Sequence, residues 1–193
     1  MGSISLKTKS KSNNLTAPGD VDLGAMIPIM TTTLATTTAT ITFSAIPQNY
    51  EHLQIRAIGR TNRANTTDVA RITYNGNTGS VYSVHVLNGD GSATESFANT
   101  SQTYQQLYIL GGANAGSNIF GTFISDILDY SNTNKNKTIR QLAGIDNNGS
   151  GVVALSSGLF QSTSAITSIT INAIGSFVQY SSFALYGIKR AGA

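Results

Sequence analysis

Residues 39–43 read Ala-Thr-Ile-Thr-Phe, an alternation of apolar and hydroxyl side chains. The same period of two continues in the nearby segment His-Leu-Gln-Ile-Arg-Ala, where Leu53, Ile55 and Ala57 share one face. Because successive side chains of a β-strand point to opposite faces, this spacing predicts strands that are buried on one side only. No window shows a convincing 3.6-residue stripe, so the predicted fold class is all-β.

Short runs rich in Val, Ile, Thr, Tyr and Phe, which suit a pleated surface, recur along the chain. They lie at residues 69–74, 81–87, 104–110, 119–130, 137–145, 152–160, 166–172 and 182–189. Asn- and Gly-rich segments, which tolerate the positive φ of tight turns, separate them at residues 75–76, 88–91, 111–112, 132–134 and 147–149. This spacing predicts an antiparallel, jelly-roll-like β-sandwich over residues 31–193, in preference to an up-and-down barrel.

The composition excludes several classes of protein. The 193 residues include no Cys and no Trp, and only 11% are charged, while Ser, Thr and Asn together make up about a third. The lack of cysteine excludes a disulfide scaffold and thiolate chemistry. No apolar run reaches the roughly 18 residues of a membrane helix, and the basic start lacks the apolar stretch of a secretory signal. A surface with so little charge is typical of a subunit that neighbours hold in an assembly.

The first thirty residues differ from the rest and are predicted to form an extended N-terminal arm. Residues 4–11 alternate apolar positions with lysines, and residues 24–30 form a short apolar patch that Pro28 interrupts. Proline blocks both a regular helix and a central strand. The residues predicted to contact a partner are Ile4, Leu6, Lys7, Lys9, Lys11, Met26, Ile27 and Ile29.

The sequence leaves several alternatives for what this arm contacts. The net charge of the chain is only +3, and the three N-terminal lysines suit a solvated tail or an arm docked on an acidic neighbour. Nucleic acid is the least favoured partner, because three lysines without interleaved aromatic residues contact few phosphates. The apolar patch could pack on its own domain or on a partner subunit.

No catalytic or metal-binding constellation stands out. His52 and His85 have no second histidine or carboxylate at ligand spacing, and both are interpreted as sheet-surface residues. Asp126 and Asp129 lie three residues apart, so on a strand they would face opposite sides and would not form a glycosidase pair. No G-x-S-x-G and no phosphate-binding glycine motif occurs. We therefore expect no enzymatic activity, no metal and no cofactor.

Other conspicuous segments have structural interpretations. Residues 146–151 resemble a calcium loop only superficially and are predicted to be a hairpin turn, as is the turn around Asp90. Residues 111–116 are predicted to form a flexible glycine-rich loop. The tyrosines are interpreted as core or strand-edge residues, with a sugar-binding platform as the alternative; they are Tyr50, Tyr74, Tyr82, Tyr104, Tyr108, Tyr130, Tyr180 and Tyr186.

Five segments resemble, in order, motifs of a widespread group of tailed-bacteriophage virion proteins. Residues 43–53, Phe-Ser-Ala-Ile-Pro-Gln-Asn-Tyr-Glu-His-Leu, are similar to the group's F-x-x-I-P-Q-x-Y-x-x-L opening. Residues 72–82 look like its F-N-G-D-x-G-x-x-Y hairpin, and residues 127–138 like its I-x-x-Y-x-N-x…K-T segment. Residues 158–169 and 183–189 are similar to its W-x-S-T-x-A-I-T-S-I run and its F-x-L-Y-G-I-K strand.

The resemblance covers roughly residues 40–190 and implies a non-enzymatic β-sandwich protein of the virion. Read with the arm, it favours a capsid cement or decoration protein that bridges neighbouring capsomers, since an extended segment can add a strand or insert apolar side chains. The expected partners are the major capsid protein or other virion subunits and further copies of the chain, as a homotrimer; neither direct nucleic-acid contact nor a membrane is expected. The alternatives are a tail, fibre or baseplate component that binds a receptor or carbohydrate, and a stand-alone carbohydrate-binding module.

Overall fold

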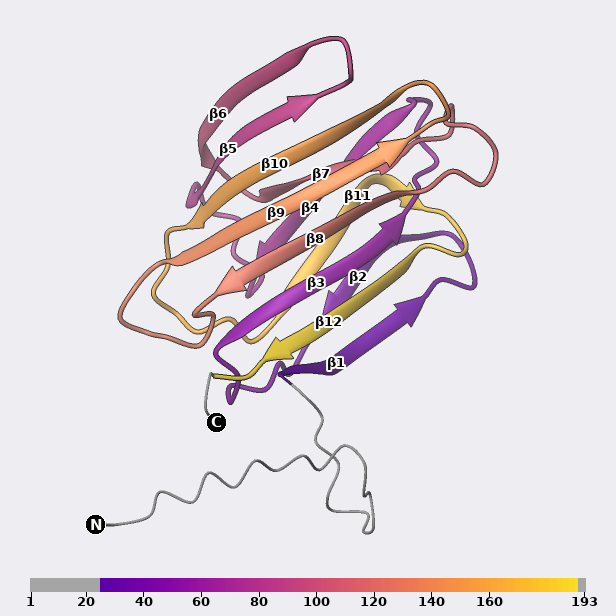
Figure 1. The fold of residues 1–193 in the computed structure, drawn as a ribbon. Helices are drawn as coiled ribbons and strands as arrows, with labels where there is room; N and C mark the ends of the chain where they lie inside the picture. The colour runs from indigo at the N-terminus through magenta and orange to yellow at the C-terminus, as the bar shows by residue number, and fades with distance from the viewer. Residues whose placement is uncertain (1–24, 191–193) are drawn as a thin grey trace, which may run out of the picture.

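A computed structural model describes residues 25–190, which form strands joined by turns and loops (Figure 1). The strands are β1 (Met26–Thr33), β2 (Thr38–Phe43), β3 (His52–Gly59), β4 (Thr67–Tyr74), β5 (Tyr82–Gly89), β6 (Thr94–Gln102), β7 (Gln105–Gly111), β8 (Gly121–Leu128), β9 (Lys137–Asp146), β10 (Gly151–Phe160), β11 (Ile169–Phe177) and β12 (Ser182–Ile188). Within this described range, no helix could span a membrane.

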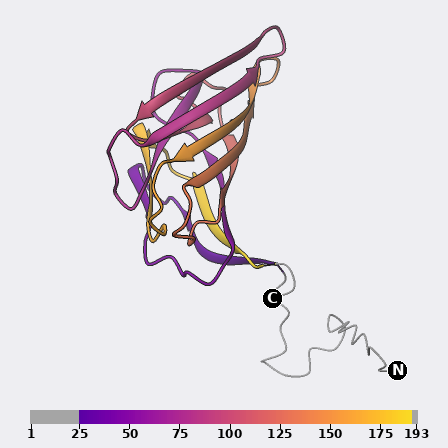
Figure 2. The same ribbon diagram turned by 90° about the vertical axis from the view of Figure 1, so that its left-hand side faces the viewer.

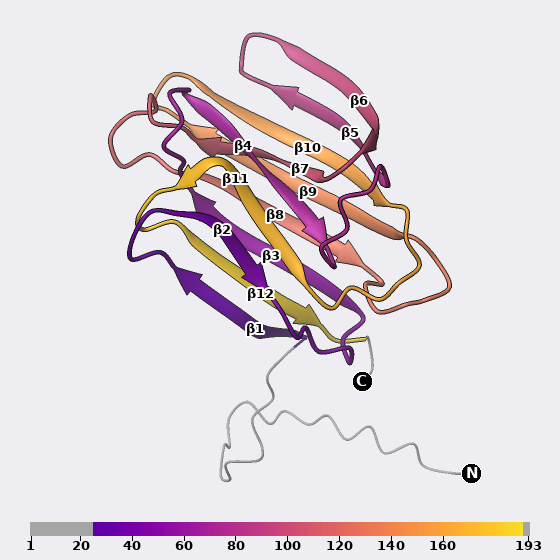
Figure 3. The same cartoon turned by 180° about the vertical axis from the view of Figure 1, so that it is seen from behind.

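The strands form two antiparallel sheets that pack face to face, which confirms the predicted all-β sandwich. The larger sheet has eight strands in the order β1-β12-β3-β8-β9-β10-β5-β6, and the smaller has four in the order β2-β11-β4-β7. The chain crosses repeatedly from one sheet to the other, as in a jelly roll (Figures 1 and 3). The β5–β6 hairpin forms one end of the larger sheet (Figure 2).

The core lies between the sheets and follows the period of two. Leu53, Ile55 and Ala57 of β3 all point inward and are buried, as the alternation predicts. At the other end of the core, the rings of Tyr82 and Phe160 stack with centroids 5.0 Å apart. The hydroxyl of Tyr82 accepts a hydrogen bond from the Tyr74 backbone N–H and donates one to the carbonyl of Asn77, so its polar end is satisfied.

Strand β1 contains the end of the predicted arm. It is the outer strand of the larger sheet and pairs with β12, from Met26 opposite Ile188 to Thr33 opposite Ser182. The register shifts between Pro28 and Met30, which is where a proline that cannot donate to the ladder is tolerated. Ile29 and Met30 pack against the core of the same domain, and the predicted boundary after residue 30 falls inside β1.

The loops match the predicted turns with one exception. Residues 146–151 form the β9–β10 hairpin turn, with Asn148 and Gly149 at positive φ. The prediction of a flexible loop over residues 111–116 is wrong, because the guanidinium of Arg60 donates hydrogen bonds to four carbonyl oxygens of residues 113–119. Several anchored carbonyls fix a loop even where glycine permits freedom.

The β2–β3 loop closes one end of the sandwich by packing on β12. A Cβ atom added to Gly187 would lie 2.4 Å from the ring of Tyr50, so this ring occupies the space that any larger residue would need. Glycine is required here for close approach. By contrast, a Cβ atom on Gly89 of β5 would make only ordinary contacts, the nearest at 3.7 Å.

We predict that Gly187→Ala lowers the free energy of unfolding by about 1–3 kcal/mol, because the Tyr50 ring must move out of a packed position. The matched control Gly89→Ala is expected to stay within about 0.5 kcal/mol of the unsubstituted protein. Urea unfolding of both variants measures the difference. Equal stability of the two variants would contradict the proposed contact.

Candidate functional site

The segments that carry the phage-like motifs meet at one end of the sandwich, which we call the motif end. It is formed by the loops that follow β2, β4, β8 and β10 and by the last residues of β12. β1 also begins at this end, because Met26 pairs with Ile188 and the N–H of Lys189 donates to the carbonyl of Ala25. Ala25, the first described residue, therefore lies at the motif end (Figure 1).

Asn75 connects two of these loops. Its backbone φ of 53° is left-handed, which asparagine tolerates. Its side-chain oxygen accepts hydrogen bonds from the backbone N–H groups of Thr167 and Ser168, at 2.8 and 3.2 Å, and its amide donates to the carbonyl of Ala165 at 2.8 Å. One side chain of the β4–β5 loop thus satisfies three backbone groups of the β10–β11 loop.

The other motifs are linked in the same way. The amide of Gln48 donates to the carbonyl of Ile166 at 3.0 Å, and the hydroxyl of Tyr130 donates to the carbonyl of Pro47. The Ile166 N–H donates to the Tyr130 carbonyl at 2.9 Å. These residues from the first, third and fourth motifs hold each other's backbone, so their contacts in the structure are architectural.

Lys137 is a charged residue inside the motif end. Its side chain is fully buried, and its ammonium group donates hydrogen bonds to the carbonyl oxygens of Asn132, Lys135 and Thr163. Three acceptors match the three N–H bonds of an ammonium group. Burial lowers the pKa of the Lys137 side chain, although the nearby Asp129 carboxylate acts in the opposite direction.

We predict that Lys137→Met lowers the free energy of unfolding by about 1–3 kcal/mol, because three carbonyls lose their donor while the apolar stem is retained. Lys135→Met serves as the control. Its side chain is 55% exposed and makes one surface ion pair, so a loss below about 1 kcal/mol is expected. Chemical denaturation at neutral pH compares the two, and a smaller effect at Lys137 would contradict its role.

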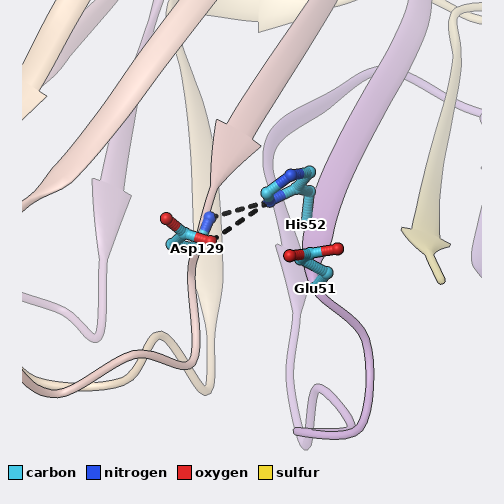
Figure 4. Close-up of side chains that lie close together, drawn as sticks. All are labelled: Glu51, His52 and Asp129. Atoms are coloured by element: carbon cyan, nitrogen blue, oxygen red, sulfur yellow. Dashed lines mark hydrogen bonds and ion pairs between the residues drawn. The ribbon is translucent and has the colours of Figure 1, made fainter. Parts of the chain in front are cut away.

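One group of three side chains of the types that can ligate a metal occurs in the described range, and it consists of Glu51, His52 and Asp129 (Figure 4). Glu51 and His52 stand at the start of β3, and Asp129 follows β8, the neighbouring strand. One ligand-type atom from each residue lies within 4.8 Å of the others. The prediction that His52 has no carboxylate neighbour at ligand spacing is therefore wrong, since strand pairing brings Asp129 to it from 77 positions away.

The hydrogen bonds of this cluster favour an ion-pair network over a metal site. His52 Nδ1 accepts a hydrogen bond of 3.0 Å from the backbone N–H of Asp129, which assigns the proton of the neutral ring to Nε2 and engages the lone pair that a metal would use. The two carboxylates each have a cation of their own. Lys135 contacts Asp129, and Arg190 lies 3.6 Å from Glu51. The hydrogen bond from Lys135 is the main cause that lowers the pKa of Asp129.

We predict that Asp129→Asn costs less than about 1 kcal/mol of stability at pH 7, because the ion pair is partly exposed. A carboxyl with a lowered pKa stabilises the fold above its ordinary pKa near 3.8 and loses that contribution as the pH falls through the folded value. The variant and the unsubstituted protein should therefore converge in stability in acid well below pH 3.8, the ordinary pKa of the carboxyl. Urea unfolding at both pH values tests this, and a difference that persists in acid would contradict the ionic origin.

The predicted partner-contacting residues fall into two groups. Ile4, Leu6, Lys7, Lys9 and Lys11 lie outside the described residues. Met26, Ile27 and Ile29 belong to β1, where all three are partly buried. The structure therefore brings the second group to the free edge of the larger sheet, beside the motif end.

The remaining candidates occupy the positions expected of structural residues. His85 lies exposed on the outer face of β5, and Asp126 forms an ion pair of 3.0 Å with Arg140 on the neighbouring strand. Tyr74, Tyr82 and Tyr130 are buried in the core, as predicted. Tyr180 is 70% exposed, and it is the one tyrosine among the exposed large apolar side chains of the described range.

Comparisons of this chain with family models, with curated proteins and with solved structures found no match.

Proposed function

We propose that this chain is a non-enzymatic structural protein of a tailed-bacteriophage particle, and that it acts as a capsid cement or decoration protein. In this proposal the β-sandwich is the body, and the N-terminal segment attaches it to the major capsid protein or to another virion subunit. The proposed location is the outer surface of the capsid.

The observation that carries the proposal is the meeting of the five motifs at one end of the sandwich. Polar side chains of the first four motifs donate hydrogen bonds to backbone carbonyls of one another. Side chains used in this way serve the architecture of the domain, and such an architecture does not by itself carry a catalytic site. This supports an inert scaffold as the function of the folded domain.

The position of β1 supports the proposed mode of attachment. β1 is an edge strand, and among residues 25–190 no strand pairs with its far side, so its backbone groups can pair with another chain. The preceding residues alternate Ile4 and Leu6 with lysines, a pattern that suits an added strand on an acidic surface. Strand addition supplies backbone hydrogen bonds, and the lysines supply long-range attraction.

We predict that deleting residues 1–24 abolishes binding to particles that lack this protein while the sandwich still folds. The deletion ends before β1, so the β1–β12 pairing is retained and circular dichroism and the thermal transition should be unchanged. Co-sedimentation of the purified variant with the particles measures binding. Deletion of residues 191–193 is the control and should leave binding intact.

The lysines can be tested separately from the apolar anchors. Replacing Lys7, Lys9 and Lys11 by glutamine should weaken binding and reduce its dependence on salt. Full binding by the 1–24 deletion would contradict attachment through this segment. The copy number in purified particles distinguishes the two locations, because a cement protein accompanies each capsomer and a tail component is present in far fewer copies.

A further inference from the structure

The outer face of the larger sheet carries most of the exposed large apolar side chains of the described residues. Six of the eight large apolar side chains that are exposed there lie on this face, on β3, β8, β9, β10 and β5. Four of them form one line across consecutive strands, which we call the apolar row: Ile124, Leu142, Leu155 and Leu87, between 36% and 53% exposed. Contiguous apolar surface of this kind marks an interaction site.

The two remaining apolar side chains lie on the neighbouring cross-strand line. This line runs across four strands, from Val153 on β10 through Gly144 on β9 and Thr122 on β8 to Ile58 on β3. On the other side of the apolar row, a polar line contains Asp126, Arg140 and His85. On one side of the apolar row, therefore, lie the protruding side chain of Val153 and the space beside Gly144. On the other side lie the polar and charged side chains of Asp126, Arg140 and His85.

A groove of about 550 Å³ lies where this face reaches β5 and β6. Leu87, Ala98 and Leu155 contribute to its lining, so an apolar side chain would fit it. The N-terminal segment of the same chain is a poor occupant. It carries three lysines, and the polar residues beside the groove include Arg140, with Arg56 further along the apolar row.

A second copy of the chain complements this face. Two facing sheets pack with their strands within about 30° of each other, so a two-fold axis can run nearly parallel to the strands, between β9 and β10. Leu142 then faces Leu155 of the partner subunit, and Ile124 faces the partner's Leu87, at the groove. Val153 faces the partner's Gly144, which leaves room for its branched side chain.

The charges agree with the same axis. Asp126 faces the partner's His85, and Arg140 faces the partner's Ser157, so no two like charges stand directly opposite each other. A two-fold axis along the apolar row would instead place each residue of that line against its own copy, and Arg56, which stands opposite Ile124 on β3, would face a second Arg56. Like charges brought together in a desolvated interface cost binding energy, and this alternative is disfavoured.

We propose that the chain forms a two-fold dimer through the outer faces of its larger sheets, with the apolar row at the centre of the interface. The dimer differs from the homotrimer that the resemblance implies, and it leaves the β1 edge and the motif end of each copy free. It does not depend on the proposed virion function.

The test is sedimentation equilibrium of the purified full-length chain over a concentration series. The unsubstituted protein should associate to twice the mass of the monomer. Leu142→Lys and Leu155→Lys should each raise the dissociation constant at least about thirty-fold, because a charge enters the centre of the interface. Circular dichroism and the thermal transition confirm that the variants fold, since both positions are exposed in the single chain.

Ile174→Lys is the matched control. Ile174 is 40% exposed but lies on β11 of the smaller sheet, so the dissociation constant should not change. The facing arrangement is tested by His85→Asp, which would set a carboxylate against Asp126 of the other subunit and weaken the dimer. Adding Asp126→Asn to this variant should restore association, because one of the two facing charges is then removed.

A monomer or a trimer throughout the concentration series would overturn the proposal, as would a dimer that tolerates lysine at Leu142 and Leu155. Normal association of the His85→Asp variant would overturn the two-fold arrangement. Since the experiment contains no particles, its failure leaves attachment to a virion untouched, and loss of particle binding by the 1–24 deletion leaves the dimer untouched.

Discussion

Each sheet of this protein has two faces, and the packing of the sandwich can cover only one of them. This constraint sets the rest of the structure. The inward positions of the strands are filled by residues such as Ile55, Phe123 and Leu185, all fully buried. Burial of these apolar side chains is the main force that holds the two sheets together. The outward positions of the larger sheet are not covered by the smaller sheet, and their chemistry is free to serve another molecule.

Strands with one buried face were predictable from the sequence because burial imposes the period of two. β9 and β10 match their predicted runs almost to the residue. β6 was not predicted, and its exposure explains why. It is an outer strand, and its residues Thr94–Gln102 include no buried side chain, so no alternation is imposed on them. β1 was predicted only as an extended segment, because Pro28 masks the pattern of a strand that tolerates it at an edge.

Polar residues at inward positions also obscured the pattern. Ser125, Gln141 and Ser156 are buried neighbours across β8, β9 and β10, and the Ser156 hydroxyl donates to the Gln141 side-chain oxygen at 3.3 Å. The Glu51–His52–Asp129 cluster could not be found from local spacing, since its members meet only through the pairing of β3 with β8. The sequence contains the residues of such a group, but sheet register decides which of them meet.

The two proposed contact regions lie on different parts of the same sheet. β1 is one edge strand, whereas the apolar row is centred on β9 and β10, the fifth and sixth strands of the order. At a spacing of about 4.8 Å between strands, the two are roughly 20 Å apart, so neither contact needs to exclude the other. The scarcity of charge fits this division, because a surface covered on its edge by one neighbour and on its face by another needs little charge to stay in solution. An extended segment at the edge and an apolar face are two separate means by which one domain can connect larger bodies.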